Sequence, residues 1–388
     1  MAALHERAGR EGTVPVIVEL RLPSGARAPR GASPAALAAL RSEIAQTRGR
    51  VLGRLAGRRA HVRREFRTVP FVALEADAES LQALLADDEV LQVTEDRLAA
   101  PQLAESGPLV QAPAAWAGGR DGAGHVVAVL DTGVDGGHSF LAGKVVDEAC
   151  FARPGGCPNG LATQAGAGAA VPCAFTPSIC RHGTHVAGIA VGAGSSFSGV
   201  ARGAGLAAIQ VFHPETECSP GEAVPCARAY SSDIGAALEH VYERRAEHAI
   251  AAVNLSLGSG LYASTCDADD PQLAAQVANL RGVGIATVVS AGNGGATGAL
   301  SWPACLSAAV SVGSTTEADA VSPFSNAGPQ LSLFAPGSSI TSSVPGELFA
   351  TFAGTSMAAP HVAGAFAVLR QAHPSASVSA LLGALQQT

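Results

Sequence analysis

The chain has 388 residues, of which 47% are hydrophobic and 15% are charged, and its formal net charge is −7. A chain of this length can form one large domain and a smaller one, each around a buried core. It has no apolar run long enough to span a bilayer and no basic stripe of the kind that binds nucleic acid. We therefore expect a globular protein that binds neither membrane nor nucleic acid.

All cysteines lie in the C-terminal three quarters of the chain. Their even number, eight, and their Gly/Pro-rich surroundings indicate disulfides formed in an oxidising compartment. A zinc site is the alternative, but no pair has the CxxC spacing. We expect the pairs Cys150–Cys157, Cys173–Cys180, Cys218–Cys226 and Cys266–Cys305, although the sequence does not fix the connectivity. The N-terminus lacks the basic and apolar regions of a secretory signal, so the cysteines alone predict a secreted, extracellular protein.

A small α+β domain is expected at the N-terminus, over residues 1–98. Its apolar patterns predict strand, helix, strand or hairpin, helix and strand, at 14–20, 33–55, 62–74, 77–85 and 90–93. Residues 99–111 lose this periodicity and collect Pro, Gly and Ser, so we interpret them as a linker. A larger domain then covers 112–388.

Apolar strands and helical stretches alternate through the larger domain. We expect strands at 126–130, 206–211, 251–255, 285–289 and 309–312, and helices at 185–190, 232–245, 269–280 and 357–369. Nearly continuous apolar strands separated by helices are typical of a parallel sheet covered on both faces. We therefore predict an α/β fold with a doubly wound, mostly parallel sheet, and a functional site at the carboxyl ends of its strands.

Three segments place reactive side chains in this pattern. Asp131 directly follows an apolar strand, where a structural Asx-turn is the alternative interpretation. His182 and His185 open a helix; they could bind a metal, but the helix lacks the Glu of a His-Glu-x-x-His motif. Ser356 lies at or near the first turn of a helix that it could simply cap. In combination the three segments indicate a serine nucleophile with a base and an orienting carboxylate.

These segments resemble the three signatures of the subtilisin-like serine proteases, the subtilase family. They read Asp-Thr-Gly at 131–133, His-Gly-Thr-His-Val-Ala-Gly at 182–188 and Gly-Thr-Ser-Met-Ala-Ala-Pro-His at 354–361, and the similarity covers about residues 108–386. The resemblance implies a serine endopeptidase that works through an acyl-enzyme.

The resemblance also assigns roles within these segments. Ser356 would be the nucleophile, His182 the base and Asp131 the carboxylate that orients the imidazole. His185 and His361 are then expected to be structural. Asp135 is a weaker candidate than Asp131 for the carboxylate.

Further site residues follow from the same resemblance. The segment Ser-Ala-Gly-Asn-Gly at 290–294 resembles the oxyanion segment, so Asn293 and the backbone N–H of Ser356 would form the oxyanion hole. Substrate-binding residues are expected at Ser256, Leu257, Gly258, Tyr230 and Ser301. Because no acidic residue lies in these segments, we expect an apolar side chain before the scissile bond.

The N-terminal domain resembles the family's inhibitory propeptide in its length and position. The resemblance implies a zymogen that folds with its propeptide, cuts itself within 99–111 and is then inhibited in the same chain. The chain departs from the family pattern at two places. It has an insertion at 214–226, and it ends at Thr388 where the family usually continues. The second departure is compatible with a truncated C-terminus.

The resemblance leaves partners and alternatives to be tested. We expect a monomer that acts on proteins or peptides and needs no cofactor for its chemistry. Structural calcium is common in the family, but the acidic cluster at 266–270 is explained equally well as a solvated loop. The alternatives are a catalytically silent subtilisin-fold binding protein and a metal-dependent hydrolase built on His182 and His185.

Overall fold

The computed structural model describes residues 2–25, 34–66, 70–95, 103–176, 178–218 and 224–388. It divides the chain into two compact units, Met1–Ala99 and Ala100–Thr388. Each unit has hydrophobic clusters of its own. None of the helices in the described part of the chain is both long and apolar enough to cross a membrane.

The N-terminal unit is a four-stranded antiparallel sheet with the order β2-β3-β1-β4. Its elements are α1 (Ala2–Glu11), β1 (Val14–Leu20), α2 (Pro34–Arg54), β2 (Ala60–Glu65), β3 (Phe71–Ala76), α3 (Ala78–Leu85) and β4 (Val90–Glu95). Every second residue of β1 is buried, as expected for a strand with one face on a core. The predicted order of strands and helices is confirmed: β2 and β3, which pair in antiparallel, stand where a strand or hairpin was expected at 62–74. Helix α1 was not predicted.

The C-terminal unit is built on an eight-stranded sheet. In sheet order its strands are β16 (Leu333–Pro336), β15 (Val310–Thr315), β13 (Ala286–Ser290), β11 (Ile250–Leu255), β5 (Val126–Asp131), β8 (Gly205–Gln210), β6 (Val145–Phe151) and β7 (Thr163–Ala165). All neighbours pair in parallel except β6 and β7. The expected strands are present; β6, β7 and β16 were not predicted.

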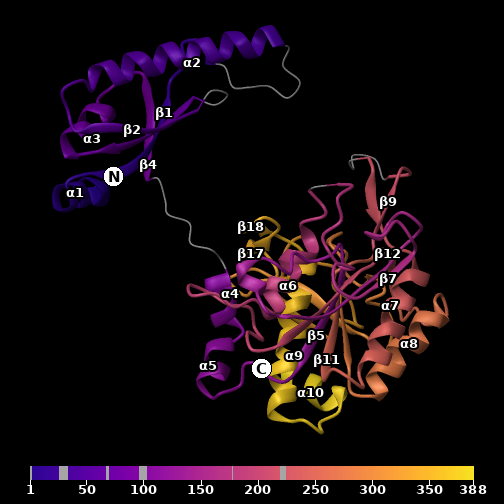
Figure 1. The fold of residues 1–388 in the computed structure, drawn as a ribbon. Coiled ribbons are helices and arrows are strands. Elements are labelled where there is room, and N and C mark those ends of the chain that lie inside the picture. The colour runs from indigo at the N-terminus through magenta and orange to yellow at the C-terminus, as the bar shows by residue number, and fades with distance from the viewer. Residues whose placement is uncertain (1, 26–33, 67–69, 96–102, 177, 219–223) are drawn as a thin grey trace. The chain divides into compact units, whose positions relative to one another are not determined.

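Helices cover both faces of this sheet, so the predicted doubly wound α/β architecture is confirmed (Figure 1). Along the fully buried β5, Val127 and Val129 belong to one hydrophobic cluster, and Ala128 and Leu130 to the other. The first cluster packs under α6 and α9, and the second under α7 and α8. Because both faces of β5 are covered, its sequence is apolar from Val126 to Leu130, before the terminal Asp131.

The remaining elements surround the sheet. The helices are α4 (Leu103–Leu109), α5 (Ala112–Ala117), α6 (His182–Val191), α7 (Ser231–Arg244), α8 (Pro271–Gly282), α9 (Thr355–Ala372) and α10 (Val378–Leu385), with a 3-10 turn at Ser139–Leu141. The strand pairs are β9 (His213–Glu215) with β10 (Cys226–Arg228), β12 (Ser259–Tyr262) with β14 (Leu300–Trp302), and β17 (Ile340–Val344) with β18 (Leu348–Phe352).

The predicted linker at 99–111 is wrong from Leu103 onward, because Leu103–Leu109 form helix α4. Ser106 on this helix is buried and its hydroxyl lies 2.9 Å from Nε2 of His361. The following residues also join the core, where Ala112 is buried. Gly107 and Pro108 lie inside this helix, so their linker-like composition misled the prediction where tertiary contacts hold the chain.

The disulfide pairing is confirmed in full: Cys150–Cys157, Cys173–Cys180, Cys218–Cys226 and Cys266–Cys305. Three of the four close short local loops. The fourth spans 39 residues. All of them lie in the C-terminal unit.

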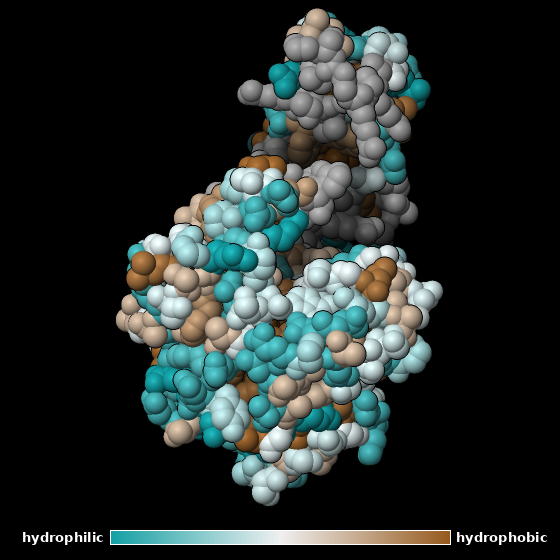
Figure 2. Space-filling model, turned by 90° about the vertical axis from the view of Figure 1, so that its right-hand side faces the viewer, coloured by the Kyte–Doolittle hydropathy of each residue, from teal (hydrophilic) through white to brown (hydrophobic). Residues whose placement is uncertain are grey.

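Exposed hydrophobic side chains are scattered over the surface. On the face drawn in Figure 2 they form small patches separated by hydrophilic surface. Small apolar patches of this kind are normal on the surfaces of globular proteins.

Candidate active site

The buried carboxylate at the end of β5 is the first component of the site. Asp131 is fully buried, and burying a carboxylate is costly unless hydrogen bonds or a charge compensate for its lost hydration. The backbone N–H of Thr132 donates to Oδ1 at 2.7 Å. Nδ1 of His182 lies 2.8 Å from Oδ1 and 2.9 Å from Oδ2. The carboxylate is therefore held at the strand end by polar partners on two elements.

The first residue of α6, His182, faces the pocket, with 25% of its side chain exposed. Since a carboxylate only accepts hydrogen bonds, Nδ1 carries the proton donated to Asp131, and Nε2 of the neutral ring is free to accept one. Burial lowers the pKa of His182, but the charge of Asp131 and the hydrogen bond to it raise the pKa more, so the net pKa lies above its ordinary value.

A glycine allows the start of α6 to approach the strand end. A Cβ on Gly183 would lie 2.3 Å from the carbonyl oxygen of Gly133 and 3.1 Å from Cβ of Asp131. The N–H of Gly183 instead donates to Oγ1 of Thr132 at 3.0 Å. This close approach fixes the contact between Asp131 and His182.

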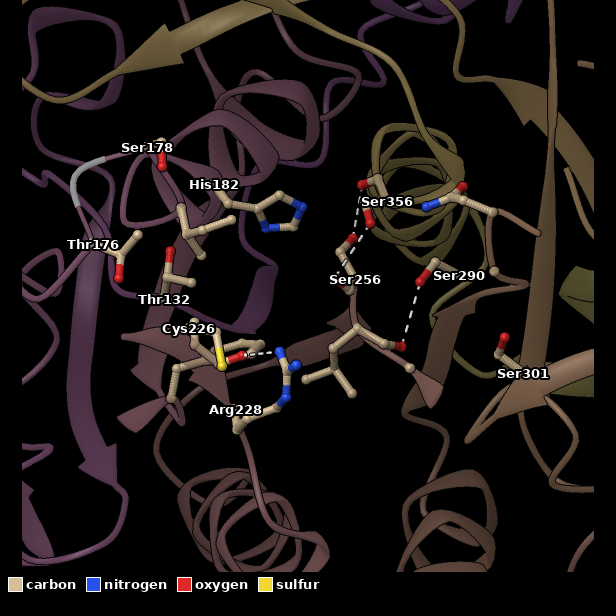
Figure 3. Close-up of a pocket in the computed structure, with 17 residues that line it drawn as sticks. Thr132, Thr176, Ser178, His182, Cys226, Arg228, Ser256, Ser290, Ser301 and Ser356 are labelled. Carbon is tan, nitrogen blue, oxygen red and sulfur yellow. Dashed lines mark hydrogen bonds between the residues drawn. The ribbon is translucent and has the colours of Figure 1, made fainter. Parts of the chain in front are cut away.

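The third component, Ser356, lies in the first turn of α9, which begins at Thr355 after Gly354. The sequence prediction for this helix start is confirmed. Oγ of Ser356 donates to the carbonyl oxygen of Ser256 at 3.3 Å. In Figure 3 the hydroxyl of Ser356 and the imidazole of His182 face each other across the pocket, although no hydrogen bond joins them within the described part of the chain.

The side-chain amide of Asn293 is oriented by the residue before Ser356. Oδ1 of Asn293 accepts hydrogen bonds from the N–H of Thr355 at 2.8 Å and from its hydroxyl at 3.0 Å. Its other end, the Nδ2 donor, has no acceptor among the described residues, and Asn293 lines the pocket that Ser356 lines. The arrangement leaves a hydrogen-bond donor beside the serine, in a pocket whose described lining contains no Asp or Glu.

The pocket that joins these residues has a volume of about 460 Å³. Its lining contains His182, Ser356, Asn293, Ser256, Leu257, Gly258 and Ser301 from the predicted residues, and Thr132, Thr176, Ser178, Ile179, Phe212, Cys226, Ala227, Arg228, Ser290 and Gly292 besides. No Asp or Glu occurs in this described lining. Ser290 and Ser301 lie on the side away from His182 (Figure 3).

Tyr230 lies elsewhere. It lines a neighbouring hollow together with Tyr262 and Trp302, among others. Its ring stacks on His213, with centroids 4.9 Å apart, and the guanidinium of Arg153 lies 3.8 Å from its centroid. The structure therefore separates Tyr230 from the other predicted substrate-binding residues.

The remaining polar candidates make their contacts outside the pocket. Nε2 of the buried His185 lies 2.9 Å from the carbonyl oxygen of Ala350, and burial lowers the pKa of His185 to about 3. His361 is also buried, and burial lowers its pKa to about 4. Asp135 accepts the N–H of Gly346 at 3.0 Å. Neither the two histidines nor Asp135 lines the pocket.

Metal ligands are not gathered in the described residues: no group of three or more His, Cys, Asp or Glu side chains could hold an ion there. In the acidic cluster at 266–270, Asp267 accepts hydrogen bonds from Ser307, and Asp270 caps the N-terminus of α8. Asp267 and Asp270 are thus each held by hydrogen-bond donors outside the cluster.

Three supporting residues were missed by the sequence interpretation. Thr132 and Thr355 lie inside recognised motifs, next to Asp131 and Ser356. Their position beside these residues could have indicated their supporting role. Asn326 contacts the loop around Asn293, but it lies far away in the sequence and in no motif.

Known proteins with similar sequences and structures are serine proteases. The model of the subtilase family (peptidase S8) matches residues 122–388. The alkaline protease of Alkalihalobacillus alcalophilus is 34% identical over 325 residues, which cover 80% of this chain and 72% of that protein. The major intracellular serine protease of Bacillus subtilis (strain 168) is 32% identical over 276 residues, 69% of this chain and 75% of that protein. The solved structure of a cold adapted subtilisin-like serine proteinase superposes with a TM-score of 0.52 at 28% identity, over 69% of this chain and 82% of that chain.

Proposed function

The chain belongs to the subtilase family and is a subtilisin-like serine endopeptidase, and from this premise we propose that Asp131, His182 and Ser356 carry out the hydrolysis. The observation that carries the proposal is the contact of Nδ1 of His182 with both oxygens of buried Asp131, at 2.8 and 2.9 Å, in the pocket that Ser356 lines. This contact leaves Nε2 to face the serine.

In the proposed first step, Oγ of Ser356 attacks the peptide carbonyl carbon while Nε2 of His182 takes the hydroxyl proton. Oγ must first leave the carbonyl oxygen of Ser256, and long catalytic hydrogen bonds are common in enzymes without substrate. The negative charge of Asp131 stabilises the imidazolium that forms and keeps the proton of Nδ1 in place.

The tetrahedral intermediate then collapses. Its C–N bond breaks, His182 gives its proton to the leaving amine, and the acyl group remains on Oγ of Ser356. Water repeats the sequence: His182 takes a proton from the water, the oxygen attacks the ester, and Ser356 recovers its proton as the acid leaves. No metal or cofactor takes part in these steps.

The negative oxygen of each intermediate is proposed to accept hydrogen bonds from Nδ2 of Asn293 and from the N–H of Ser356. The latter lies in the first turn of α9, where unpaired N–H groups and the helix dipole favour negative charge. Loss of one such donor costs about 2.7–4 kcal/mol of transition-state stabilisation, a value taken from subtilisin itself.

The substrates are proposed to be proteins or peptides. Ser256, Leu257, Gly258 and Ser301 would contact the side chain before the scissile bond, and the described pocket lining offers no carboxylate to a basic group there. An apolar side chain at this position is therefore preferred. Tyr230 would contact a more distant part of the substrate, because it lines the neighbouring hollow.

Residues 1–98 are proposed to be an inhibitory propeptide. They form a compact unit with a core of their own. The alignment with the alkaline protease supports this, since it covers 80% of the chain, more than the Ala100–Thr388 unit alone can supply. Self-cleavage within 99–111 would fall before Ser106, whose hydrogen bond to His361 ties it to the catalytic unit.

We place the enzyme outside the cell as a monomer. Four disulfides support an oxidising compartment, although one relative is named an intracellular protease. An expressed chain that keeps free thiols while active would contradict the secreted location. Sedimentation of the mature protein as a dimer would contradict the monomer.

The test of the catalytic assignment compares wild type with Ser356→Ala by fluorophosphonate labelling and intact mass. We expect one label on wild type and loss of roughly the first hundred residues, and neither event in the variant. A labelled but unprocessed wild type would reject the propeptide. A wild type that lacks the N-terminal unit yet takes no label would indicate a silent binding protein, and loss of activity in chelator would favour a metal-dependent hydrolase.

A further inference from the structure

Asn326 lies in the chain between β15 and β16 with only 1% of its surface exposed. Its side-chain amide makes hydrogen bonds at all four of its positions. Oδ1 accepts from the N–H groups of Gly294 and Ala296, both at 3.0 Å, and Nδ2 donates to the carbonyl oxygen of Ala291 at 3.1 Å and to Oγ of Ser301 at 3.3 Å. A buried amide with every partner present holds its surroundings in one geometry.

These partners lie on both sides of Asn293 along the chain. The backbone N–H of Asn326 adds a fifth bond, to the carbonyl oxygen of Gly292 at 2.9 Å. Gly292 is pressed against the same group: its φ is +103°, and a Cβ there would lie 2.2 Å from Oγ of Ser301 and 2.4 Å from Nδ2 of Asn326. Hydrogen bonds from Asn326, which lies outside the loop, thus hold the loop that carries Asn293 in place.

We infer that Asn326 is a positioning residue for the oxyanion donor. It acts through Asn293 and does not touch the substrate. Thr355 fixes the side-chain oxygen of Asn293, whereas Asn326 fixes the backbone from which that side chain extends. The inference rests on the proposed role of Asn293.

Positioning matters here because a donor stabilises the transition state only at a fixed place. The donor must lie 2.7–3.1 Å from the developing oxyanion, and a shift of about 1 Å can cost about a hundredfold in rate. Asn326 also donates a hydrogen bond to Ser301 in the pocket wall. The same side chain therefore holds the loop of the oxyanion donor at a fixed position relative to the substrate pocket.

Holding the loop in this way requires an amide. Asn326→Asp preserves the shape but replaces the Nδ2 donor with an oxygen, which then faces the carbonyl oxygen of Ala291. Two acceptors in contact repel, so the loop must shift or the new carboxyl must take up a proton.

A double-mutant cycle tests the inference. The proteins are wild type, Asn326→Asp, Asn293→Ala and the double variant, each made as the full chain and processed by immobilised wild-type enzyme that is removed with its resin. A Ser356→Ala sample treated identically gives the background. Ser311→Ala is the matched control, because the buried hydroxyl of Ser311 bonds to Gln330 and Ser332 and does not line the active-site pocket. Circular dichroism establishes folding, and kcat and KM are measured on a peptide p-nitroanilide.

We expect Asn326→Asp to lower kcat by about 10- to 100-fold with KM changed less than about threefold, and Asn293→Ala to lower kcat by about 10²–10³-fold. In the Asn293→Ala background, Asn326→Asp should lower kcat by no more than about threefold further, because the donor it positions is already gone. Ser311→Ala should keep kcat within about twofold of wild type.

An equal effect of Asn326→Asp in both backgrounds would overturn the inference, since it would show that the substitution lowers kcat by a route that bypasses Asn293. Wild-type kcat in folded Asn326→Asp would also overturn it. Wild-type kcat in Asn293→Ala would instead refute the proposed oxyanion donor itself. If Asn326→Asp does not fold, Asn326→Ser replaces it in the same cycle with the same expectations.

Discussion

The hydroxyl of Ser256 donates a hydrogen bond to the carbonyl oxygen of Ser356 at 2.7 Å. In a regular helix that carbonyl would accept the N–H four residues later, but the residue there is Pro360, which has none. Ser256 thus supplies the donor that the helix lacks. It connects the pocket wall to the turn that carries the nucleophile.

Ser256→Ala should weaken both the fold and the catalytic geometry. The substitution removes the donor to the carbonyl oxygen of Ser356. It also removes the acceptor of Nδ2 of Asn254, which donates to the Ser256 hydroxyl at 2.9 Å. We expect the free energy of unfolding to fall by about 1–3 kcal/mol and kcat/KM to fall roughly tenfold. Urea unfolding in the Ser356→Ala background and peptide kinetics measure the two effects. The exposed Ser375, which lines neither the active-site pocket nor the hollow of Tyr230, provides the control, and Ser375→Ala should change neither quantity. An equal unfolding midpoint for Ser256→Ala and wild type would mean that the bond adds no stability.

Asp131→Asn should lower kcat by about 10⁴-fold, because an amide lets the imidazole take the wrong tautomer and cannot stabilise imidazolium. Asp135→Asn is the matched control, since that carboxylate bonds to Gly346 and not to His182. Its kcat should stay close to wild type. If the two variants lost activity equally, the assignment of Asp131 would fail.

The same pair of variants predicts a shift of the pH profile. Only neutral His182 can take the proton of Ser356, so kcat/KM should rise with pH through the pKa of His182, which Asp131 raises. Removing the charge of Asp131 lowers that pKa, and the acid limb of the weak Asp131→Asn activity should move to lower pH. The limb of Asp135→Asn should stay at the wild-type pH, and an unmoved limb in Asp131→Asn would contradict the electrostatic role.

The sheet and the three motif segments could be predicted because their signals are local. The apolar run of β5 from Val126 to Leu130, followed by Asp131, indicates a covered strand with a polar end. The motif around Ser356 begins a helix as expected. The short loops of three disulfides also favoured local pairing, which the structure confirms.

The residues that support the site could not be predicted because their signals are contacts between distant segments. Asn326 reaches a loop about thirty residues earlier in the sequence, and Ser256 reaches Ser356 across 100 residues. Helix α4 is stabilised by burial of Ser106 against His361, which local composition cannot reveal. Tyr230 was placed by resemblance alone, and its packing on His213 and Arg153 joins segments that no motif connects.

The buried His361 predicts a loss of stability in acid. Nδ1 lies 2.8 Å from the carbonyl of Met357, so it carries the proton, and Nε2 accepts from the hydroxyl of Ser106. Burial lowers the pKa of His361 to about 4. Because the unfolded chain binds this proton near pH 6.5, the unfolded state holds more protons between about pH 6.5 and 4, and stability falls as pH falls through that window.

His361→Gln in the Ser356→Ala background should therefore flatten the pH dependence of stability. Between pH 6 and 4.5 the free energy of unfolding should fall less steeply than in the parent, by up to about 1.4 kcal/mol per pH unit. The exposed His373→Gln is the control and should keep the parent slope. Urea unfolding at several pH values measures both slopes, and equal slopes for the parent and His361→Gln would refute the buried neutral histidine.

The disulfide Cys173–Cys180 should affect catalysis more than the short loop that it closes would suggest. Cys180 stands two residues before His182, whose N–H bonds to Ile179 at 2.9 Å, and the N–H of Cys173 donates to the carbonyl of Thr132 at 2.9 Å. The bridge therefore joins the chain beside Asp131 to the start of α6. Replacing both cysteines with serine should lower kcat/KM at least about tenfold by loosening His182, and lower the free energy of unfolding by about 2–3 kcal/mol.

Cys150–Cys157 provides the matched control, because it closes a loop of the same sequence separation, 7 residues, and Cys150 and Cys157 do not line the pocket. Its double serine variant should lose a similar amount of stability, because the loop-closure entropy is the same, while kcat/KM per folded molecule stays near wild type. Urea unfolding in the Ser356→Ala background and kinetics on the active variants separate the two effects. Equal losses of kcat/KM in both variants would mean that Cys173–Cys180 stabilises the unit as a whole and does not position His182.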